Sequence, residues 1–277
     1  MVYKDEKLVA LLPANASHKK IVSHQGLTYG GLIVSESIKI KDFTSCLKAV
    51  LVYFKKEQFT HVQIKELPAI YSFVPNEELK YLMFILEASL LRRDTLSVLN
   101  LNQKPKPSKD RIAGYKRAEK HGLRVEEVDD FDAFWNAILI PNLKAKHETQ
   151  PVHTLNEIIK LKAKFPKNIR QFNVYKDDKI VAGTTIFETK NVAHSQYISG
   201  NDDKNTIGSL DYLHTYLINE VFKEKTYFDF GVSNENNGKN INEGLNYWKE
   251  GFGARTITQD FYEIDLNNLN KLDTIFT

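Results

Sequence analysis

Between residues 192 and 252 the hydrophobic positions switch repeatedly between strand-like and helical spacing. The pattern alternates over Val192–Ser199, which predicts a strand, and then repeats at helical spacing over Leu210–Val221. An aromatic strand at Tyr227–Gly231 and a second amphipathic helix at Leu245–Phe252 follow. Strand, helix, strand and helix in this order normally build a mostly parallel segment of sheet.

The rest of the chain continues this succession of elements. In the second half, a strand at Leu123–Val128, two helices and a hairpin precede the stretch just described. The first of these helices is expected to end before Pro141. In the first half, helices alternate with strands, and one helix is expected at Glu77–Arg93. Both halves therefore predict an α/β fold with a mixed sheet.

A change of composition separates the halves. Residues 104–124 hold eight Lys or Arg against two acids. This basic segment begins in the linker Gln103–Ser108, which two prolines stiffen. We therefore expect a first half at 1–101, a basic linker and helix at 102–122, and a second half at 123–277. The first half repeats the order of elements of the second from its second strand onward. We expect two copies of one fold, the first lacking the opening strand and two helices.

The composition of the whole chain excludes several classes of protein. Its 277 residues, 42% of them hydrophobic, suffice for a real core, and the formal net charge of +3 gives no global case for nucleic acid or membrane binding. A single cysteine, Cys46, allows no intrachain disulfide and fits a reducing compartment. No signal peptide and no apolar run of membrane-spanning length is visible, so we expect a cytoplasmic protein.

The helix entered from a polar glycine loop, the strand that reads YFDFG and the helix after it resemble the GNAT superfamily of N-acyltransferases. Within that superfamily they resemble the Fem-type branch, whose members attach amino acids to cell-wall peptides. The residues that carry this resemblance are Asp229, Gly231, Gly244, Leu245, Trp248, Lys249, Phe252 and Gly253. The resemblance implies two GNAT-like halves with a site in the cleft between them. It also implies acyl transfer to an amine of an amino-sugar or cell-wall-type precursor.

The resemblance places the donor site at the start of the helix Leu210–Val221. Relatives that use coenzyme A carry Gln/Arg-x-x-Gly-x-Gly/Ala there, because backbone N–H groups at a helix start bind pyrophosphate. The corresponding cofactor-binding candidates are Lys204, Asn205, Gly208 and Ser209. Asn205 and Leu210 depart from the family pattern. Acetyl-CoA or another acyl-CoA is therefore one expected cofactor, and a plain glycine–serine helix cap is the alternative.

Two residues of the same stretch are candidates for catalysis. Lys249 occupies the aromatic-Lys position that Fem-type enzymes place near the donor carbonyl, where an ammonium could stabilise an oxyanion. Alternatively, it is a solvated lysine that pairs with Glu250 or Asn246. Asp229 lies between aromatics in a strand, where a buried charge needs a partner. We expect it to bind or deprotonate the substrate amine, or instead to cap a helix or pair with Arg255.

Candidate substrate-binding residues come from three segments. A glycine-rich loop, residues 23–31, combines backbone freedom with polar side chains, and the strand at 192–199 has one polar face. The basic helix at 111–121 could clamp a phosphate or simply present a solvated face. The candidates are His24, Gln25, Tyr29, Arg111, Tyr115, Lys116, Gln196 and Tyr197. No metal is expected, because His147 and His153 lack a third ligand at suitable spacing.

Three functions remain open from the sequence. The first is an N-acyltransferase with a small-molecule acceptor, which a phosphate clamp would make a nucleotide-sugar or a lipid-linked precursor. Aminoacyl-tRNA is the less favoured donor, because the chain has no sustained heptad run for the coiled-coil arm that Fem-type enzymes using it often carry. The second is a non-catalytic ligand-binding module on the same fold. The third is a nucleic-acid binder acting through residues 104–124.

Overall fold

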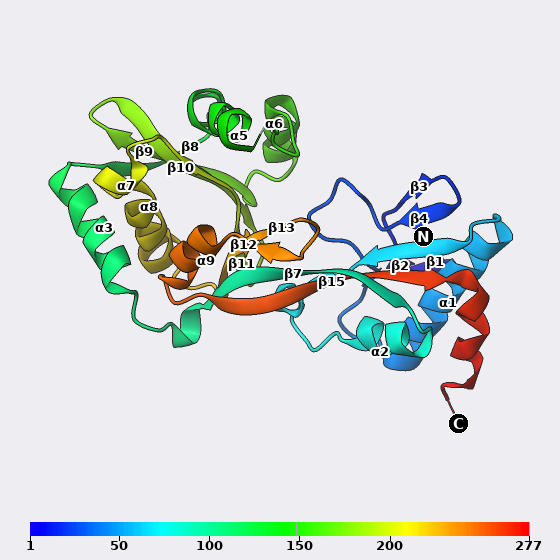
Figure 1. Ribbon diagram of the computed structural model, residues 1–277. Coiled ribbons are helices and arrows are strands. Elements are labelled where there is room, and N and C mark those ends of the chain that lie inside the picture. Colours follow the sequence, from blue (N-terminus) through cyan, green and yellow to red (C-terminus); the bar gives the residue numbers. More distant parts are fainter. Residues whose placement is uncertain (148, 277) are drawn as a thin grey trace. The chain divides into compact units, whose positions relative to one another are not determined.

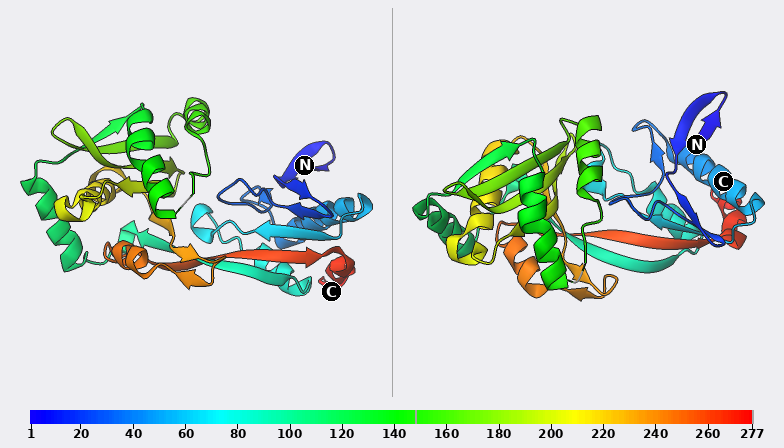
Figure 2. Two further views of the ribbon diagram at one scale, coloured as in Figure 1. Left: turned by 45° about the horizontal axis from the view of Figure 1, so that its top comes forward. Right: turned by 90° about the horizontal axis from the view of Figure 1, so that it is seen from above.

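The computed structural model describes residues 1–147 and 149–276, and the chain divides into two compact units. Figure 1 follows the chain by colour, and Figure 2 gives two further views. Unit 1 comprises Met1–Thr95, Asn234–Asn240 and the chain from Thr258 onward, and unit 2 comprises Leu96–Ser233 and Ile241–Ile257. Two long strands, β7 (Ser89–Asn100) and β15 (Arg255–Asp265), each contribute residues to both units.

Unit 2 is built on a mixed sheet. In order across the sheet, its strands are β7, β12 (Tyr227–Val232), β11 (Val192–Gly200), β10 (Lys179–Glu188), β9 (Ile169–Lys176) and β8 (Arg124–Val128). β11 and β12 run parallel, whereas β12 with β7 and the successive pairs from β8 to β11 are antiparallel. The predicted mixed α/β fold is therefore confirmed. A short ribbon pairs β13 (Asn234–Glu235) with β14 (Asn240–Ile241).

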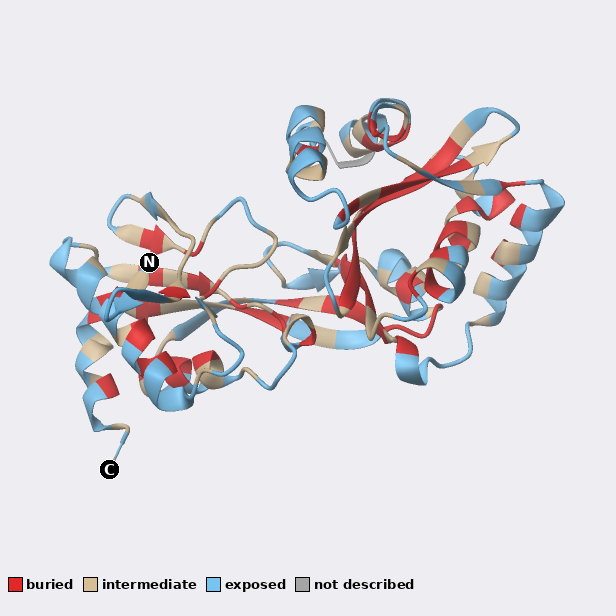
Figure 3. Ribbon diagram, turned by 180° about the vertical axis from the view of Figure 1, so that it is seen from behind, coloured by how far each residue is buried: buried red, intermediate tan, exposed pale blue. Residues whose placement is uncertain are grey.

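Helices cover both faces of the unit 2 sheet, as Figures 1 and 2 show. One face carries α4 (Asp132–Phe134), η3 (Trp135–Leu139), α5 (Ile140–His147) and α6 (Leu155–Lys164). The other face carries α7 (Lys204–Ile207), α8 (Ser209–Tyr216), η4 (Leu217–Val221) and α9 (Glu243–Glu250), with α3 (Lys109–Lys120) packed against α7 and α8 after the short η2 (Leu101–Gln103). Because apolar layers lie on both faces, the central strands are buried along most of their length (Figure 3).

The helix that was expected to end before Pro141 continues past it. A π-helical segment, η3, joins α5 at Ile140, and α5 runs on to His147. Pro141 thus lies inside a continuous helical segment, directly after the wider π-helical turn of η3. The expected end of this helix was wrong, because the π-helical turn before Pro141 lets the chain continue in a helical path through the proline.

Unit 1 combines two sets of strands with two longer helices. A three-stranded sheet has the order β1 (Val2–Lys4), β2 (Lys7–Leu11), β5 (Ile33–Val34). The other strands follow the order β3 (Asn15–Ser17), β4 (Lys20–Val22), β6 (His61–Lys65), β15, β7. The helices are α1 (Ile40–Lys56), α2 (Glu78–Ile85), η1 (Ala69–Tyr71) and η5 (Leu266–Thr274). The core of this unit joins α1, α2 and β6 to side chains of β15 and η5.

The helix predicted at Glu77–Arg93 is only half as long in the structure. α2 ends at Ile85, Glu87 takes a left-handed φ of 51°, and β7 begins at Ser89. Leu90, which the helical spacing turned inward, is 47% exposed. Strand pairing wins here because β7 lies beside β15, where Arg93 forms a bidentate ion pair with Asp260. Tertiary contacts of this kind commonly override a helical pattern.

The two units differ in extent from the ranges expected from the sequence. Residues 234–240 and the segment from Thr258 onward group with residues 1–95, although they belong to the expected second half at 123–277. The basic linker and helix at 102–122 fall inside unit 2. That the chain contains two copies of one fold stays a prediction.

Candidate functional site

The parallel strands β11 and β12 are paired near the start of β11. Their register joins Val192–His194 to Tyr227–Asp229, whereas β11 runs on to Gly200. The carboxyl end of β11 therefore extends beyond the segment paired with β12. In open α/β sheets, ligands bind outside the carboxyl ends of strands where neighbours separate, so this end of β11 is the first place to look for a site.

A cavity of about 350 Å³ lies at the carboxyl end of β11. Its walls come from η3, α5, β11, α7, α8 and α9, all of which belong to unit 2. The lining residues are Leu139, Asn142, Leu143, Ile198, Ser199, Gly200, Lys204, Asn205, Leu210, Gly244, Leu245 and Trp248. Most of these side chains are apolar, while Lys204 supplies a positive charge and the two asparagines supply amides. An apolar cavity with a few convergent polar groups is typical of a small-molecule site.

The predicted cofactor residues separate into two pairs. Lys204 and Asn205 line the cavity, and their role as cofactor-binding residues stays a prediction. Gly208 is left-handed, with φ 72°, and an added Cβ would lie 2.0 Å from the carbonyl oxygen of Gly114 in α3. Ser209 is fully buried. The glycine at this position is thus explained by the close approach of α3, which needs no phosphate.

Leu210 stands where the family pattern has Gly or Ala, and its direction decides whether a donor can enter. It lines the cavity and also packs against the main core of unit 2. Leu210 therefore forms part of the cavity wall at the start of α8. A ligand in this cavity would contact its side chain, whereas a small residue there would let a phosphate reach the backbone.

Asp211 links three helices below the cavity. It is 6% exposed, and its Oδ1 accepts hydrogen bonds from Arg111 Nη1 and from the indole Nε1 of Trp248, both at 2.8 Å. Burial raises the pKa of Asp211, while the charge of Arg111 and the bond from Trp248 oppose this. Gly114 makes room for the carboxylate, since a Cβ there would lie 1.7 Å from Asp211 Oδ2.

The two predicted catalytic residues are buried with internal partners. Lys249 is 2% exposed, and its ammonium donates to the carbonyl oxygens of Gly231 at 3.0 Å and Val232 at 2.6 Å. Burial lowers the pKa of Lys249 to about 8, and the charge of Asp229 opposes this. Asp229 is fully buried and accepts from His194 Nδ1 at 2.9 Å and from the backbone N–H of Gly231 at 2.7 Å.

These contacts fasten β12 to its neighbours. Asp229 is bonded to His194 across the β11–β12 pair, and not to Arg255, whose Nη1 donates to the carbonyl of Ala254. Lys249 connects α9 to the end of β12 through its bonds to Gly231 and Val232, and it does not pair with Glu250 or Asn246. Neither residue is part of the cavity lining. A catalytic role for Lys249 and Asp229 stays a prediction, and the geometry supports a positioning role more directly.

The other substrate candidates on β11 lie away from the cavity. Tyr197 is 8% exposed and packs against Trp135, on the face of the sheet that carries η3. Its hydroxyl lies 2.7 Å from Nδ1 of His153. Gln196 is half-buried and, like Tyr197, is not among the cavity-lining residues. Ile198 and Ser199 contribute to the cavity instead.

The basic helix α3 uses part of its charge internally. Arg111 is paired with Asp211, and Arg117 Nη2 donates to the backbone carbonyl of Asn205 at 3.2 Å. Tyr115 stacks near Tyr212 of α8, with ring centroids 5.2 Å apart. Lys116 is exposed. One face of α3 is therefore an interior surface of unit 2, and the other face fits the solvated alternative.

The glycine-rich loop of unit 1 is held by its own contacts. His24 takes a left-handed φ of 49°, and Gln25 exchanges two 2.9 Å hydrogen bonds with Asn15. Tyr29 is hydrogen-bonded through its hydroxyl to Tyr71. A Cβ at Gly30 would lie 2.6 Å from both oxygens of Ser23, so only glycine fits there. That this loop binds a substrate stays a prediction.

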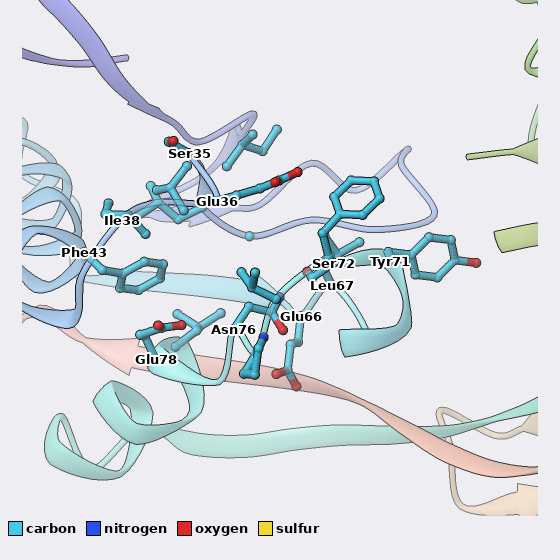
Figure 4. A pocket seen from close by; sticks show the side chains of 18 of the residues that line it. Ser35, Glu36, Ile38, Phe43, Glu66, Leu67, Tyr71, Ser72, Asn76 and Glu78 are labelled. Carbon is cyan, nitrogen blue, oxygen red and sulfur yellow. The ribbon is translucent and has the colours of Figure 1, made fainter. Parts of the chain in front are cut away.

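Unit 1 has a cavity of its own, of about 250 Å³, between the loop that includes Gly30 and the start of α2. Figure 4 shows Phe43 entering from α1, Glu66 and Asn76 side by side, and Tyr71 pointing away from them. Glu66 is 6% exposed and lies 3.6 Å from the ammonium of Lys80. Burial raises its pKa to about 7, because the charge of Lys80 only partly offsets desolvation.

Within residues 1–147 and 149–276, no helix is both long and apolar enough to cross a membrane. Of the side chains that the structure describes, no three His, Cys, Asp or Glu are grouped so that they could hold a metal ion. The side chain of His147, one of the two histidines considered for zinc, lies outside the described set.

Sequence reasoning missed several residues of the cavity lining, Asn142 among them, and also the neighbouring Asp211. Asn142 lines the cavity and donates from its amide to Ser199 Oγ at 2.9 Å and to the carbonyl of Gly200 at 2.7 Å. Asp211 was missed because it lies between the apolar positions Leu210 and Leu213 of α8. A charged residue one position after Leu210, in the first turn of a buried helix, was the available signal, because such a charge needs a partner.

No protein-family model matches the sequence, and a search of the curated proteins finds no match. Solved structures do match. The C-terminal domain of a protein assigned as a lysylphosphatidylglycerol synthetase from Agrobacterium fabrum has a TM-score of 0.64 at 13% identity, covering 96% of this chain and 84% of that one. L-PGS from Bacillus licheniformis has a TM-score of 0.61 at 14% identity, covering 94% and 82%.

FemX gives a third match, with a TM-score of 0.63 at 11% identity over 90% of this chain and 84% of that one. At such low identities the likeness concerns the fold alone. It agrees with the mixed sheet, the parallel β11–β12 pair and the helix order described above. The chain therefore has the fold of FemX and of the L-PGS domain, which confirms, at the level of the fold, the resemblance to the Fem-type branch.

Proposed function

We propose that this chain is an acyltransferase and that the unit 2 cavity binds its acyl donor. The observation that carries the proposal is the position of the cavity, at the carboxyl end of β11 beyond its pairing with β12. The fold supports it, because solved structures that share this fold include FemX and a protein named as a lysylphosphatidylglycerol synthetase. Both lines of support are independent of the residues that were expected to be catalytic.

The lining fits an acyl group attached to a polar carrier. Ile198, Leu210 and Trp248 offer apolar surface to the acyl chain, while Lys204 offers an ammonium to an anionic carrier such as a phosphate. The amide of Asn142 is oriented by its two bonds to β11. We propose acetyl-CoA or another acyl-CoA as the donor. An aminoacyl ester would present a similar carbonyl and is the alternative donor.

The acceptor that we propose is an amine of a small molecule, an amino-sugar or a cell-wall-type precursor. Its nitrogen lone pair attacks the donor carbonyl, the carbonyl carbon becomes tetrahedral, and the thiolate or alkoxide then leaves and takes up, directly or through water, the proton that the nitrogen loses. Such a transfer depends chiefly on positioning and on a polarised carbonyl, so no covalent nucleophile is required. In this proposal Lys249 and Asp229 act through the geometry of β12 and α9, to which they are bonded.

A bulky side chain at Gly244 tests the donor site. Gly244 lines the cavity from α9, and, apart from its chain neighbours and its own helix backbone, the one described atom within 4 Å of an added Cβ is Asn242 Oδ1 at 3.9 Å. Gly244→Phe should therefore fold and fill the cavity. We expect it to weaken acetyl-CoA binding at least about tenfold in calorimetric titration, which corresponds to about 1.4 kcal/mol.

Gly244→Ala is the matched control, because it makes the same backbone change with little volume. It should bind as the parent does. Equal affinities of parent and Gly244→Phe would place the donor elsewhere, and a parent that binds no acyl-CoA would contradict coenzyme A as the carrier.

A non-catalytic binding module is the second candidate, and the buried, internally bonded state of Lys249 and Asp229 favours it. The two candidates differ in turnover. With acetyl-CoA and a panel of amino-sugars, an acyltransferase releases free thiol in proportion to acylated amine. A module that binds acyl-CoA without releasing thiol under any acceptor would support the second candidate.

A further inference from the structure

We propose that Asp211 is a positioning residue that holds the indole of Trp248 as a wall of the unit 2 cavity. We infer further that this wall limits the size of the acyl group that the cavity accepts. The second statement rests on the proposed function, whereas the first concerns the protein without any ligand.

The polar end of the indole is hydrogen-bonded to Asp211. Nε1 of Trp248 donates to Asp211 Oδ1 at 2.8 Å, and the same oxygen accepts from Arg111 Nη1 at 2.8 Å. Trp248 also lines the cavity, so the anchored ring is itself the wall. A buried indole N–H normally requires a partner, and this requirement fixes the orientation of the ring.

The body of the indole is packed edge-to-face against three other rings. Its centroid lies 5.0 Å from that of His214, 5.8 Å from Phe230 and 5.1 Å from Phe252, with interplanar angles between 81° and 89°. His214 is fully buried, and burial lowers its pKa to about 4, so it is a neutral ring at physiological pH. These contacts hold the body of the indole, and the bond to Asp211 fixes its polar edge.

The surroundings of Asp211 are shaped to receive a carboxylate. Arg111 and Gly114 are three residues apart on α3 and so lie on the same face of this helix. Arg111 supplies the charge, and Gly114 supplies the space, since a Cβ there would lie 1.7 Å from Asp211 Oδ2. The basic helix α3 is thereby connected to Trp248 of the cavity wall through the carboxylate of Asp211. This connection gives α3 a role in the site without any contact with a ligand.

The first experiment measures the indole directly. The chain has two tryptophans, so Trp135→Phe leaves Trp248 as the sole tryptophan, which is excited selectively at wavelengths where tyrosine does not absorb. In that background, Asp211→Leu removes the acceptor at similar volume, and Asp211→Asn keeps an acceptor oxygen. We expect Asp211→Leu to raise the acrylamide quenching constant of Trp248 at least about twofold and to lower its anisotropy, and Asp211→Asn to restore both.

Ile218→Ala is the control for general destabilisation, because Ile218 is 4% exposed in η4 and is not part of the cavity lining. It should lower stability without changing the quenching of Trp248. Should Asp211→Leu fail to fold, Asp211→Ser takes its place, since its shorter side chain leaves space and withdraws the acceptor. A folded Asp211→Leu or Asp211→Ser protein with parental quenching and anisotropy overturns the positioning role.

The second experiment tests selectivity by titration with acetyl-CoA and hexanoyl-CoA. In the parent the fixed indole of Trp248 should favour the two-carbon acetyl group over the hexanoyl group. In Asp211→Leu the ratio of the dissociation constants of hexanoyl-CoA and acetyl-CoA should fall about tenfold toward one. In Asp211→Asn the ratio should stay close to that of the parent. An unchanged ratio in a variant whose indole is mobile overturns the size limit. A parent that binds neither compound contradicts the proposed donor, while the quenching result still decides the role of Asp211.

Discussion

The carboxyl group of Glu66, directly after β6, is buried, and the charge of Lys80 only partly offsets the cost of removing its carboxylate from water. Burial raises its pKa to about 7, whereas an unfolded glutamate titrates near 4.5. Between these values the folded chain holds a proton that the unfolded chain releases, so this group's contribution to stability is complete below pH 4.5 and is lost as the pH rises through 7. Glu66→Gln should remove this dependence, so that from pH 5 to 7.5 the parent loses about 1–3 kcal/mol more stability than the variant in urea unfolding.

Glu77→Gln provides the matched control, because Glu77 also pairs with Lys80, at 3.1 Å, but its side chain is 65% exposed. Its pH dependence should follow that of the parent. If Glu66→Gln showed the parental pH dependence, the carboxyl group of Glu66 would have to titrate as it does in water.

At the same scale, the sequence predicted which residue types needed partners but not which partners they have. Asp229 was expected to need a counter-charge or a hydrogen bond, and it has both a histidine and a backbone N–H. His194 is distant from it in the sequence and becomes its neighbour only through the parallel register of β11 and β12. For Lys249 the alternative to a catalytic role was a pair along its own helix, whereas its partners are the carbonyl oxygens of Gly231 and Val232. Such partners depend on strand register, which one sequence does not reveal.

Among the elements, the contact between α3 and α8 depends on glycine. Gly114→Ala would bring a methyl group against Asp211, and this overpacking should outweigh the gain in helix propensity. We expect a net loss of about 1–3 kcal/mol in the free energy of unfolding, measured in urea.

Gly244→Ala serves again as the comparison, because it is also a helical glycine but has open space around its Cβ. Its stability should rise by up to about 1 kcal/mol from helix propensity alone. Destabilisation of both variants by the same amount would contradict the explanation through Asp211.

Element prediction succeeded where local pattern and tertiary contacts agree. The second of the two helices expected before the hairpin appears as α6, which a capping box of Thr154 and Glu157 begins, and the aromatic strand and the helix after it appear as β12 and α9. It failed at residues 86–93, where an apolar helical spacing continues but the chain joins a sheet. It also failed at Pro141, where a π-helical turn precedes the proline and the helix continues through it.

At the scale of the molecule, unit 1 is assembled from separated segments. β15 lies between β6 and β7 in strand order, and Ile264, Leu266 and Leu272 belong to the unit 1 core. We expect residues 1–95 expressed alone to lack a cooperative thermal transition, because the central strand and part of the core are missing. Joining residues 258–276 through a short flexible linker should restore that transition, as followed by circular dichroism.

The linked fragment carrying Ile264→Asp is the control, since this side chain is fully buried. It should behave like residues 1–95 alone. Cooperative unfolding of residues 1–95 without the added segment would show that β15 is dispensable for this unit. The sequence contained the strand but no local sign of its position, because β15 pairs with β6 across most of the chain.

The central place of β15 also governs the order of events on the ribosome. β6 and β7 leave the exit tunnel early, but the strand that joins them begins only at Arg255. During most of translation the nascent chain therefore exposes two unpaired strand edges and the apolar faces of α1 and α2. Nascent chains with such exposed surface tend to be substrates of chaperones, and closure through contacts distant in sequence is slow. The rate at which folded protein accumulates in a cell should therefore depend on how long chaperones protect this incompletely folded nascent chain.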